Sequence, residues 1–404
     1  MRILVANDGF GDAGGVQQYL ESCVGELLAR GHSAAVVHRD PIGLPARVSP
    51  TIASLPQFSI VSAGIDGAVA SARAWAPDVC FSHNMDALEL DRRLAAAVPV
   101  VKFMHGYFGT CISGLKMHAF PAARPCGRVF GPACAALFLP CRCGRLSPTA
   151  LVSQYRWAGD QRRLFRSYRA VVVASDHMRR EYIRNGVDAS KVHLNPLFPT
   201  CRAAASPAPP ATRPTVAFLA RMTALKGGDV LVRAVAHAAR RLGEPIALTM
   251  IGDGPERARC EALARELGVD ADFTGWLDDE RRFAAVRRAD LIAVPSVWPE
   301  PFGLSGLEGA AQGVPAIAFD VGGVREWLRP GVNGVLVDGD PPRASAFGDA
   351  LADALADRAR LAAMRLAALD VAREMSVARH VDRLEALLER CAGVAEPAAR
   401  QVTG

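Results

Sequence analysis

Residues 291–310 read LIAVPSVWPEPFGLSGLEGA, and this stretch decides the fold class of the chain. Its first four residues are apolar, which is typical of a parallel strand buried on both faces. A turn rich in proline and glycine follows, and we expect a helix to begin near Leu304. A buried strand that runs through a short loop into a helix is the repeating unit of an α/β protein with a doubly wound sheet.

The same stretch predicts a ligand. Free backbone N–H groups at the start of a helix attract phosphate. Two carboxylates flank that start, because Glu300 precedes the expected helix and Glu308 lies within it. A phosphate site bracketed by acids suits a molecule that joins phosphates to polyhydroxylated rings, and a nucleotide sugar is such a molecule.

The stretch resembles the Glu-x7-Glu signature of retaining glycosyltransferases of family 4, which have the GT-B architecture. Further motifs follow in the order of that family, and they are ARMTALKGG (220–228), GDGP (252–255), FTGW (273–276), GVP (313–315), GGVRE (322–326) and NGVLV (333–337). The first half matches more loosely, through GGV (14–16), GH (31–32) and HG (105–106). The resemblance implies an α/β fold with two Rossmann-like doubly wound domains that face each other across a cleft.

A chain of 404 residues is also long for a single core, which favours two domains. We expect an N-terminal acceptor-side domain at 1–200, a proline-rich linker at 201–214, a nucleotide-sugar-binding domain at 215–376, and a crossover helix with a tail at 377–404. Apolar runs predict strands of the first domain at 3–6, 34–37, 79–81, 98–103 and 171–174.

The resemblance assigns roles to residues of the second half. Arg221 and Lys226 form a basic pair that neutralises the departing diphosphate, so that a divalent metal is not required. Glu300 contacts hydroxyl groups of the donor sugar, and Glu308 binds the ribose. The backbone N–H groups of Phe302, Gly303 and Leu304 complete the predicted donor site.

Three residues of the first half belong to the same prediction. His105 follows a strand, and by resemblance it contacts the donor sugar; a buried, satisfied histidine is the alternative. Gly14 and Gly15 allow the first loop to approach the donor phosphates. The predicted catalytic set is therefore His105, Arg221, Lys226 and Glu300. No covalent nucleophile stands out, and the resemblance implies front-face attack assisted by the leaving phosphate.

The resemblance implies retaining transfer of a hexose-like unit from a nucleotide sugar to a glycan or lipid-linked acceptor. We expect the donor to carry UDP rather than GDP. The expected biological setting is synthesis of a bacterial surface polysaccharide or glycoconjugate. Two alternatives stay open: a nucleotide-sugar epimerase of the same fold, and a catalytically inactive nucleotide-sugar-binding protein. We expect no cofactor, and we interpret the D-x-D pair Asp338 and Asp340 as a turn rather than a metal site.

Charge is divided unevenly along the chain. Residues 1–200 hold 22 basic and 14 acidic residues, whereas residues 201–404 hold 25 and 27. The basic first half is either a solvated surface or one that faces an anionic acceptor or membrane. Aromatic residues make up only 6% of the chain, which argues against a nucleic-acid partner. No apolar run is long enough for a membrane span or a signal peptide, so we expect a cytoplasmic protein, peripheral on the membrane as an alternative.

Residues 111–147 form a Cys/Gly/Pro-rich insertion that interrupts the first domain. A structural metal held by its thiols and a set of unligated thiols are both compatible with the sequence; the candidate ligands are Cys126, Cys134, Cys141 and Cys143. Residues 151–168 then predict a basic amphipathic helix. Such a helix either lies on anionic lipid or packs its apolar face on the core.

Overall fold

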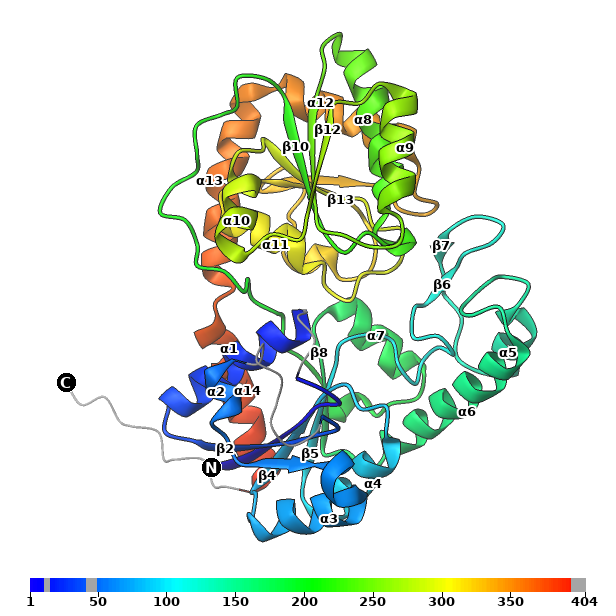
Figure 1. Cartoon of the computed structure of the whole chain (residues 1–404), viewed down its shortest axis with the longest axis vertical. Helices are drawn as coiled ribbons and strands as arrows, with labels where there is room; N and C mark the ends of the chain where they lie inside the picture. Colours follow the sequence, from blue (N-terminus) through cyan, green and yellow to red (C-terminus); the bar gives the residue numbers. More distant parts are fainter. Residues whose placement is uncertain (11–14, 41–48, 394–404) are drawn as a thin grey trace, which may run out of the picture.

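The computed structural model describes residues 1–10, 15–40 and 49–393, and it consists of two α/β domains, each built on a parallel sheet (Figure 1). The predicted sites of phosphate contact at Gly15 and in the second half lie within these ranges, whereas Gly14 lies outside them. The architecture is the two-domain α/β fold that the sequence predicts.

The first sheet has seven strands in the order β3-β2-β1-β4-β5-β8-β9, and every pair is parallel. The strands are β1 (Arg2–Ala6), β2 (Ser33–His38), β3 (Gln57–Ser59), β4 (Val79–Ser82), β5 (Val100–Met104), β8 (Ala170–Val173) and β9 (Val192–Leu194). The central strands are almost entirely buried, because helices cover both faces of the sheet.

The helices of the first domain pack in two layers. On one face α1 lies against the C-terminal helix α14, and on the other α3 packs on α4, which packs on α6. The segments are α1 (Gly15–Ala29), α2 (Pro50–Ala53), α3 (Ile60–Ala74), α4 (Leu88–Ala97), α5 (Pro132–Phe138), α6 (Pro148–Leu164), α7 (Asp176–Arg184) and the 3-10 turn η1 (Ala189–Lys191).

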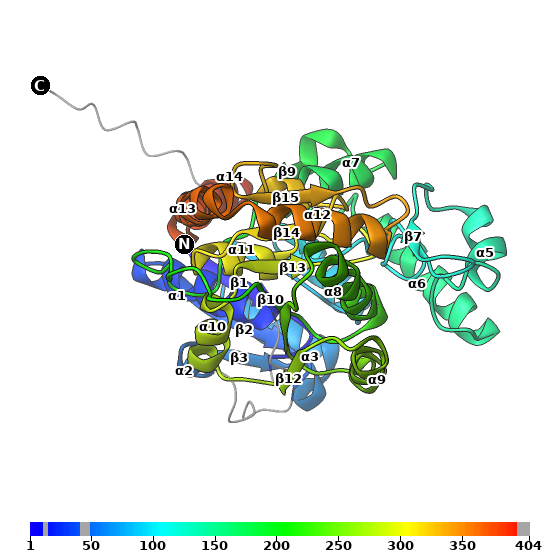
Figure 2. The same ribbon diagram turned by 90° about the horizontal axis from the view of Figure 1, so that it is seen from above.

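The second sheet has six parallel strands in the order β12-β11-β10-β13-β14-β15. They are β10 (Thr215–Leu219), β11 (Ala247–Ile251), β12 (Ala271–Gly275), β13 (Leu291–Val294), β14 (Ala316–Phe319) and β15 (Gly334–Val337). Figure 2 shows α8, α9 and α12 on one face of this sheet and α10, α11 and α13 on the other. The helical segments are η2 (Ala224–Lys226), α8 (Gly228–Leu242), α9 (Arg257–Leu267), α10 (Asp279–Arg287), α11 (Leu304–Ala311), η3 (Val324–Glu326), α12 (Ala344–Ala356) and α13 (Arg358–Glu374).

The last helix, α14 (Val377–Ala392), returns to the first domain and packs against α1 (Figure 1). Arg30 of the first domain bonds Asp382 and Glu385 of α14, each at 2.7 Å. His380 of α14 contacts two segments of the first domain, with its Nε2 atom 2.9 Å from the Tyr19 hydroxyl and its Nδ1 atom 2.8 Å from the Pro196 carbonyl. The crossover helix thereby ties the end of the chain to the first sheet.

The cysteine-rich insertion forms a lobe at the side of the first domain (Figure 1). It holds a two-stranded antiparallel ribbon of β6 (Met117–His118) and β7 (Arg124–Pro125), followed by α5. Its buried core is small and consists of Ile112, Phe130, Phe138 and Ala158. Lys116 is buried, and its Nζ atom forms an ion pair with Glu181 Oε2 of α7 at 2.6 Å, which anchors the lobe to the domain.

The helix expected at 151–168 begins and ends earlier than predicted, since α6 covers Pro148–Leu164. The Ser147 side chain accepts a hydrogen bond from the Ala150 N–H, and Pro148 occupies the first turn, where its missing N–H has no consequence. The helix stops at Leu164 because the chain must turn back to enter β8 at Ala170.

Candidate functional site

Two loops at the carboxyl ends of β10 and β13 pack against each other. The Val297 N–H donates to the Leu225 carbonyl at 2.9 Å. Gly227 has φ of +67°, and a Cβ atom there would lie 2.0 Å from the Pro295 carbonyl oxygen. Only glycine tolerates both conditions. This close contact holds Lys226, which directly precedes Gly227, beside the loop that leads into α11.

Glu300 is the best-connected side chain of that loop. The residue is only 3% exposed. Its Oε1 atom accepts hydrogen bonds from Lys226 Nζ at 2.6 Å, Ser296 Oγ at 2.5 Å and Trp298 Nε1 at 3.1 Å. Its Oε2 atom accepts no hydrogen bond from the described residues, so one carboxylate oxygen is fixed and the other is available to a ligand.

Glu308 lies inside α11 and is 6% exposed. Thr200 Oγ1 donates to its Oε1 atom at 2.5 Å. Burial raises the pKa of the Glu308 carboxyl, and the hydrogen bond from Thr200 partly opposes that effect. The two glutamates therefore differ in environment, because Glu300 has a cationic partner whereas Glu308 has a neutral one.

The start of α11 presents free amide groups. Gly303 is the N-cap residue with φ of +85°, and the helix begins at Leu304 as the sequence predicts. The N–H groups of Phe302, Gly303 and Leu304 donate to no acceptor in the described part of the chain. Unsatisfied N–H groups at a helix start, together with the helix dipole, form a site for an anion such as phosphate.

Arg221 follows β10 and is exposed. Its guanidinium has no hydrogen-bond or ion-pair partner among the described residues. The backbone of the loop that carries Arg221 is fixed. The Met222 N–H donates to the Asp253 carbonyl at 2.8 Å, and the Glu256 N–H donates to the Met222 carbonyl at 3.0 Å. Arg221 is thus an unpaired cation on a loop whose backbone is fixed by hydrogen bonds.

His105 directly follows β5 of the first sheet. Its Nε2 atom lies 3.0 Å from His83 Nδ1. Burial, together with smaller contributions from the charges of Lys102 and His380, lowers the pKa of His105 to about 3. The imidazole is therefore neutral near pH 7. Its hydrogen-bond partner is the other imidazole, His83, and not a carboxylate.

Contacts between the domains bring residues that follow strands of the first sheet close to the donor-site loop of the second domain. The Tyr107 hydroxyl lies 3.5 Å from the Glu300 carbonyl and 2.9 Å from His177 Nδ1. Glu326 accepts a hydrogen bond from the Asp176 N–H at 2.6 Å, so a carboxylate of the second domain caps helix α7 of the first. The carboxyl ends of both sheets therefore face the loop that carries Glu300.

Sequence reasoning missed several partners of the predicted residues. Ser296 and Trp298 lie within the quoted stretch, and their position between a buried strand and a helix was a usable signal. Thr200 and Tyr107 carry no such signal, because each lies about 100 or more residues from the glutamate that it approaches.

Two further observations concern metals and membranes. Over 1–10, 15–40 and 49–393, no group of three or more His, Cys, Asp or Glu side chains is arranged to hold a metal ion, and the cysteines are free thiols. Asp340 N donates to Asp338 Oδ1 at 3.2 Å, which is turn geometry. No helix in the described ranges has the length and apolar character that crossing a membrane requires.

Comparison with known proteins covers both halves of the chain. The family model "Glycosyltransferase Family 4" matches residues 13–197, and "Glycosyl transferases group 1" matches residues 202–370. A D-inositol 3-phosphate glycosyltransferase of Nocardia farcinica is 41% identical over 164 residues, which are 39% of this chain and 36% of that protein. A GDP-mannose-dependent alpha-(1-6)-phosphatidylinositol monomannoside mannosyltransferase of Mycolicibacterium smegmatis is 34% identical over 199 residues, 45% of this chain and 51% of that protein. Each match thus spans less than two thirds of the relative.

Solved structures agree over nearly the whole length. HepE of Anabaena, solved with UDP, has a TM-score of 0.71 at 18% identity, over 96% of this chain and 100% of that one. Sucrose-phosphate synthase of Thermosynechococcus elongatus has a TM-score of 0.72 at 19% identity, over 98% and 100%. The chain accordingly belongs to the family 4 glycosyltransferases and has their two-domain GT-B fold.

Proposed function

We propose that this protein transfers a sugar, with retention of anomeric configuration, from a nucleotide-sugar donor to a glycan or lipid-linked acceptor. We expect the nucleotide of the donor to be UDP rather than GDP. The proposed setting is synthesis of a bacterial surface polysaccharide or glycoconjugate. The donor is a substrate, and the proposal includes neither a cofactor nor a divalent metal.

The contact between Lys226 and Glu300 carries the proposal. It places a fixed cation and a fixed carboxylate beside the free N–H groups of α11, while Arg221 is unpaired nearby in the chain. A departing diphosphate needs positive charge and N–H donors that are already in place. A sugar ring needs a carboxylate oxygen that can accept from its hydroxyl groups, and Glu300 Oε2 is available for this.

Two observations support a nucleotide sugar as donor. HepE, which has a similar fold, was solved with UDP and with UDP-glucose. The name of the Mycolicibacterium relative specifies GDP-mannose. We therefore propose a UDP-sugar first and a GDP-sugar second.

A thermal-shift panel of UDP, GDP and ADP tests the donor. A ligand at 100 times its dissociation constant adds about 2.7 kcal/mol of stability, which a shift in melting temperature reveals. The same assay with the corresponding sugar nucleotides identifies the sugar, and NMR of the product identifies its anomeric configuration. Absence of a shift with every nucleotide, or an inverted product, contradicts the proposal.

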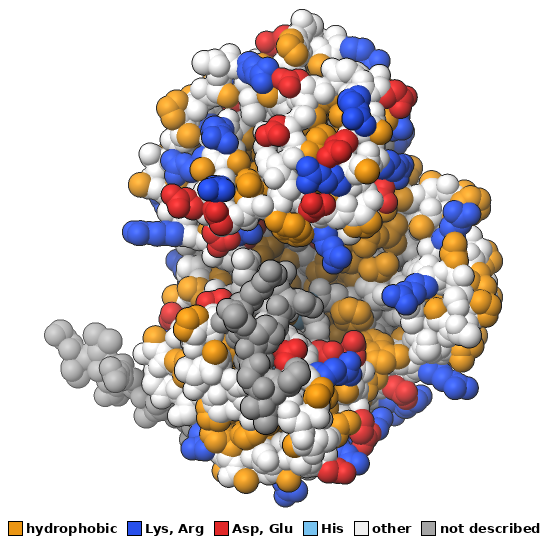
Figure 3. All heavy atoms as spheres, in the orientation of Figure 1, with side chains coloured by type: hydrophobic (Ala, Val, Ile, Leu, Met, Phe, Trp, Pro, Cys, Tyr) orange, Lys and Arg blue, Asp and Glu red, His pale blue; other side chains and the backbone are white. Residues whose placement is uncertain are grey.

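We also propose that the lobe of the first domain rests on an anionic membrane surface. Exposed apolar side chains lie on this lobe and on the adjoining helix α6, namely Phe120, Val129, Leu146 and Val152. Exposed arginines lie among them, namely Arg124, Arg128, Arg142, Arg145 and Arg156, and Figure 3 shows hydrophobic and basic surface together on this lobe. Apolar and basic groups on one surface favour binding at an anionic lipid interface.

Sedimentation with vesicles tests this association. The protein should sediment with vesicles that contain phosphatidylglycerol and not with pure phosphatidylcholine. Leu146→Ser should weaken the association, whereas Val332→Ser should not, because Val332 is similarly exposed (51%) but lies on the second domain. Equal binding to both kinds of vesicle contradicts the electrostatic part of the proposal.

A further inference from the structure

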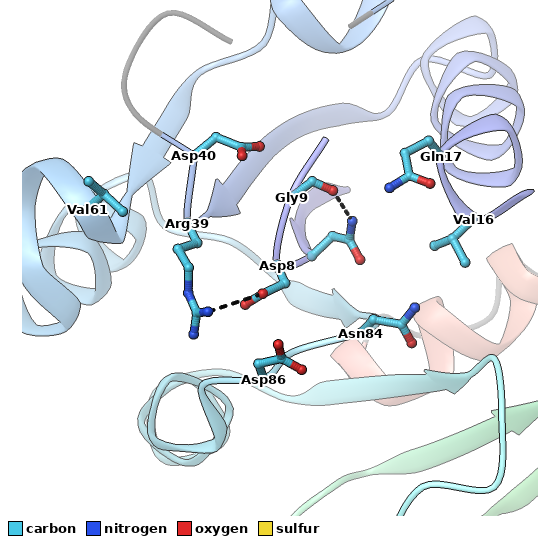
Figure 4. Close-up of a pocket in the computed structure, with 10 residues that line it drawn as sticks. Asp8, Gly9, Val16, Gln17, Arg39, Asp40, Val61, Asn84 and Asp86 are labelled. Carbon is cyan, nitrogen blue, oxygen red and sulfur yellow. Dashed lines mark hydrogen bonds and ion pairs between the residues drawn. The ribbon is translucent and has the colours of Figure 1, made fainter. Parts of the chain in front are cut away.

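A cavity of about 510 Å³ lies on the first domain, and none of the predicted donor residues of the second domain lines it (Figure 4). It opens at the carboxyl ends of β1, β2 and β4, and its polar lining includes Asn7, Asp8, Arg39, Asp40, Asn84 and Asp86. None of these residues has a role in the proposed function or belongs to a motif of the second half.

The position of the cavity relates it to the donor site. β1, β2 and β4 run parallel to β5 and β8 in one sheet, so their carboxyl ends share an edge. Residues that follow β5 and β8, Tyr107 and Asp176, contact Glu300 and Glu326 of the second domain. The cavity is therefore on the edge of the first sheet that faces the donor-binding domain.

The charged groups of the cavity are mostly hydrogen-bond acceptors. Three carboxylates, Asp8, Asp40 and Asp86, outnumber the single guanidinium of Arg39. The Arg39 Nη1 atom is already 3.5 Å from Asp8 Oδ2. Figure 4 shows Asp8 between Arg39 and Asp86, which leaves the lining with an excess of negative charge.

An unpartnered buried atom indicates that the cavity binds a ligand. Asn7 lines the cavity and is only 3% exposed. Its Nδ2 atom donates to the Gly9 carbonyl at 2.6 Å, but its Oδ1 atom has no partner in the described part of the chain. Asp8 Oδ1, on the next residue, is likewise buried and unpartnered. Buried polar atoms are rarely left unpaired, so both oxygens require an N–H or O–H donor from outside.

The chemistry of the lining selects the ligand. Hydroxyl and protonated amino groups donate hydrogen bonds to carboxylate and amide oxygens, whereas a phosphate group offers only more acceptor oxygens and more negative charge. Like charges placed together in an interface reject the wrong partner. We propose that this cavity binds the acceptor through a non-phosphorylated sugar residue, whose hydroxyl or ammonium groups donate to Asn7, Asp8 and Asp86.

This inference rests on the proposed transfer reaction and names its acceptor class. It separates this chain from the relatives whose names specify D-inositol 3-phosphate. The cations of the second domain would then serve the donor phosphates, while the carboxylates of the first domain serve the acceptor hydroxyls.

Ligand-observed NMR on the full-length protein with UDP present tests the proposal. The probes are methyl α-glucoside, its 2-amino-2-deoxy counterpart and inositol phosphate. Both non-phosphorylated sugars should bind, and the phosphate should bind at least about tenfold more weakly because of like-charge repulsion. Comparison of the two sugars distinguishes hydroxyl donors from an ammonium group. Tighter binding of inositol phosphate overturns the proposal.

Asp86→Asn provides the variant, since Asp86 is exposed and its removal does not disturb the core. It should weaken binding of the amino sugar by about tenfold, because a charge-assisted hydrogen bond is lost. The matched control is Asp272→Asn, at an exposed position of β12 in the other domain. Unchanged sugar binding in Asp86→Asn overturns the assignment. A protein that binds UDP but none of the sugars rejects this site, whereas one that binds sugars but no nucleotide rejects the proposed function.

Discussion

Lys226 Nζ lies 2.6 Å from Glu300 Oε1, although the two residues are 74 positions apart in the chain. The same ammonium lies 5.6 Å from the centre of the Trp298 ring. Glu300 is buried, and a buried carboxylate that loses its partner is strongly destabilised. The two residues therefore act as a unit, in which the lysine orients the glutamate and the glutamate positions the lysine.

The cation pair provides the first prediction. Arg221→Ala or Lys226→Ala should lower turnover at least about tenfold, because in the proposed reaction each removes a fixed charge that would stabilise the leaving diphosphate. The measurement is the initial rate at saturating donor. Arg240→Ala is the matched control, since Arg240 is exposed on α8 and is not one of the predicted site residues. Wild-type rates in either site variant would refute the assigned role.

A second prediction concerns Gly227. Gly243 also has positive φ (+75°), but a Cβ there meets nothing within 4 Å. Gly243→Ala should lower the free energy of unfolding by about 1–2 kcal/mol through backbone strain alone. Gly227→Ala should lower it by more and should also weaken UDP binding, because the Pro295 carbonyl would be displaced. Urea unfolding and UDP titration measure the two effects. Equal losses in both variants would show that the close contact is unimportant.

A third prediction concerns pH. Burial lowers the pKa of His105 to about 3 and that of His380 to about 4. The unfolded chain therefore binds protons that the folded chain does not, from about pH 6.5 downward. Stability from these groups is complete above pH 6.5 and falls as the pH approaches 4, by about 1.4 kcal/mol per pH unit for each group.

His380→Gln tests the pH prediction, because glutamine retains a donor and an acceptor but does not titrate. The variant should show a smaller loss of stability between pH 6.5 and pH 4 than the wild-type protein, measured by urea midpoints. The raised pKa values of Glu308 and Glu326 act in the opposite direction, so the difference between variant and wild type is the informative quantity. Identical pH profiles for His380→Gln and wild type would contradict the prediction.

The fourth prediction is that turnover survives EDTA. In the proposed reaction, Arg221, Lys226 and the N–H groups at the start of α11 would supply the positive charge that a divalent cation supplies in other enzymes. The measurement is the initial rate after dialysis against EDTA. Complete loss of activity that manganese restores would overturn the metal-free proposal.

The strands predicted from apolar runs in the first domain correspond to β1, β2, β4, β5 and β8, with boundaries that differ by no more than two residues. Such runs are informative because a parallel strand buried on both faces needs apolar residues at successive positions. β3 (Gln57–Ser59) and β9 (Val192–Leu194) were not predicted. Both are three-residue strands at the edges of the sheet, where one side lacks a neighbour and the apolar pattern weakens.

Charge was harder to interpret from the sequence. Lys116 belongs to the basic first half of the chain, yet it is buried against Glu181. The arginines around it are exposed, as a solvated or membrane-facing surface requires. Lys116 differs from these arginines because its partner, Glu181, lies 65 residues away in the chain. The local sequence around Lys116 does not indicate that partner.

The sequence by itself determined the α/β class, the strand–loop–helix unit around Glu300, and the kinds of residue that surround a phosphate. These follow from local periodicity and from the order of motifs along the chain. Tertiary structure alone decided which groups meet: Lys226 with Glu300, Thr200 with Glu308, and Glu326 with the start of α7. The physical reason is that hydrogen bonds and ion pairs act over a few ångströms in space, whereas these partners are separated by 74 to 150 positions along the chain.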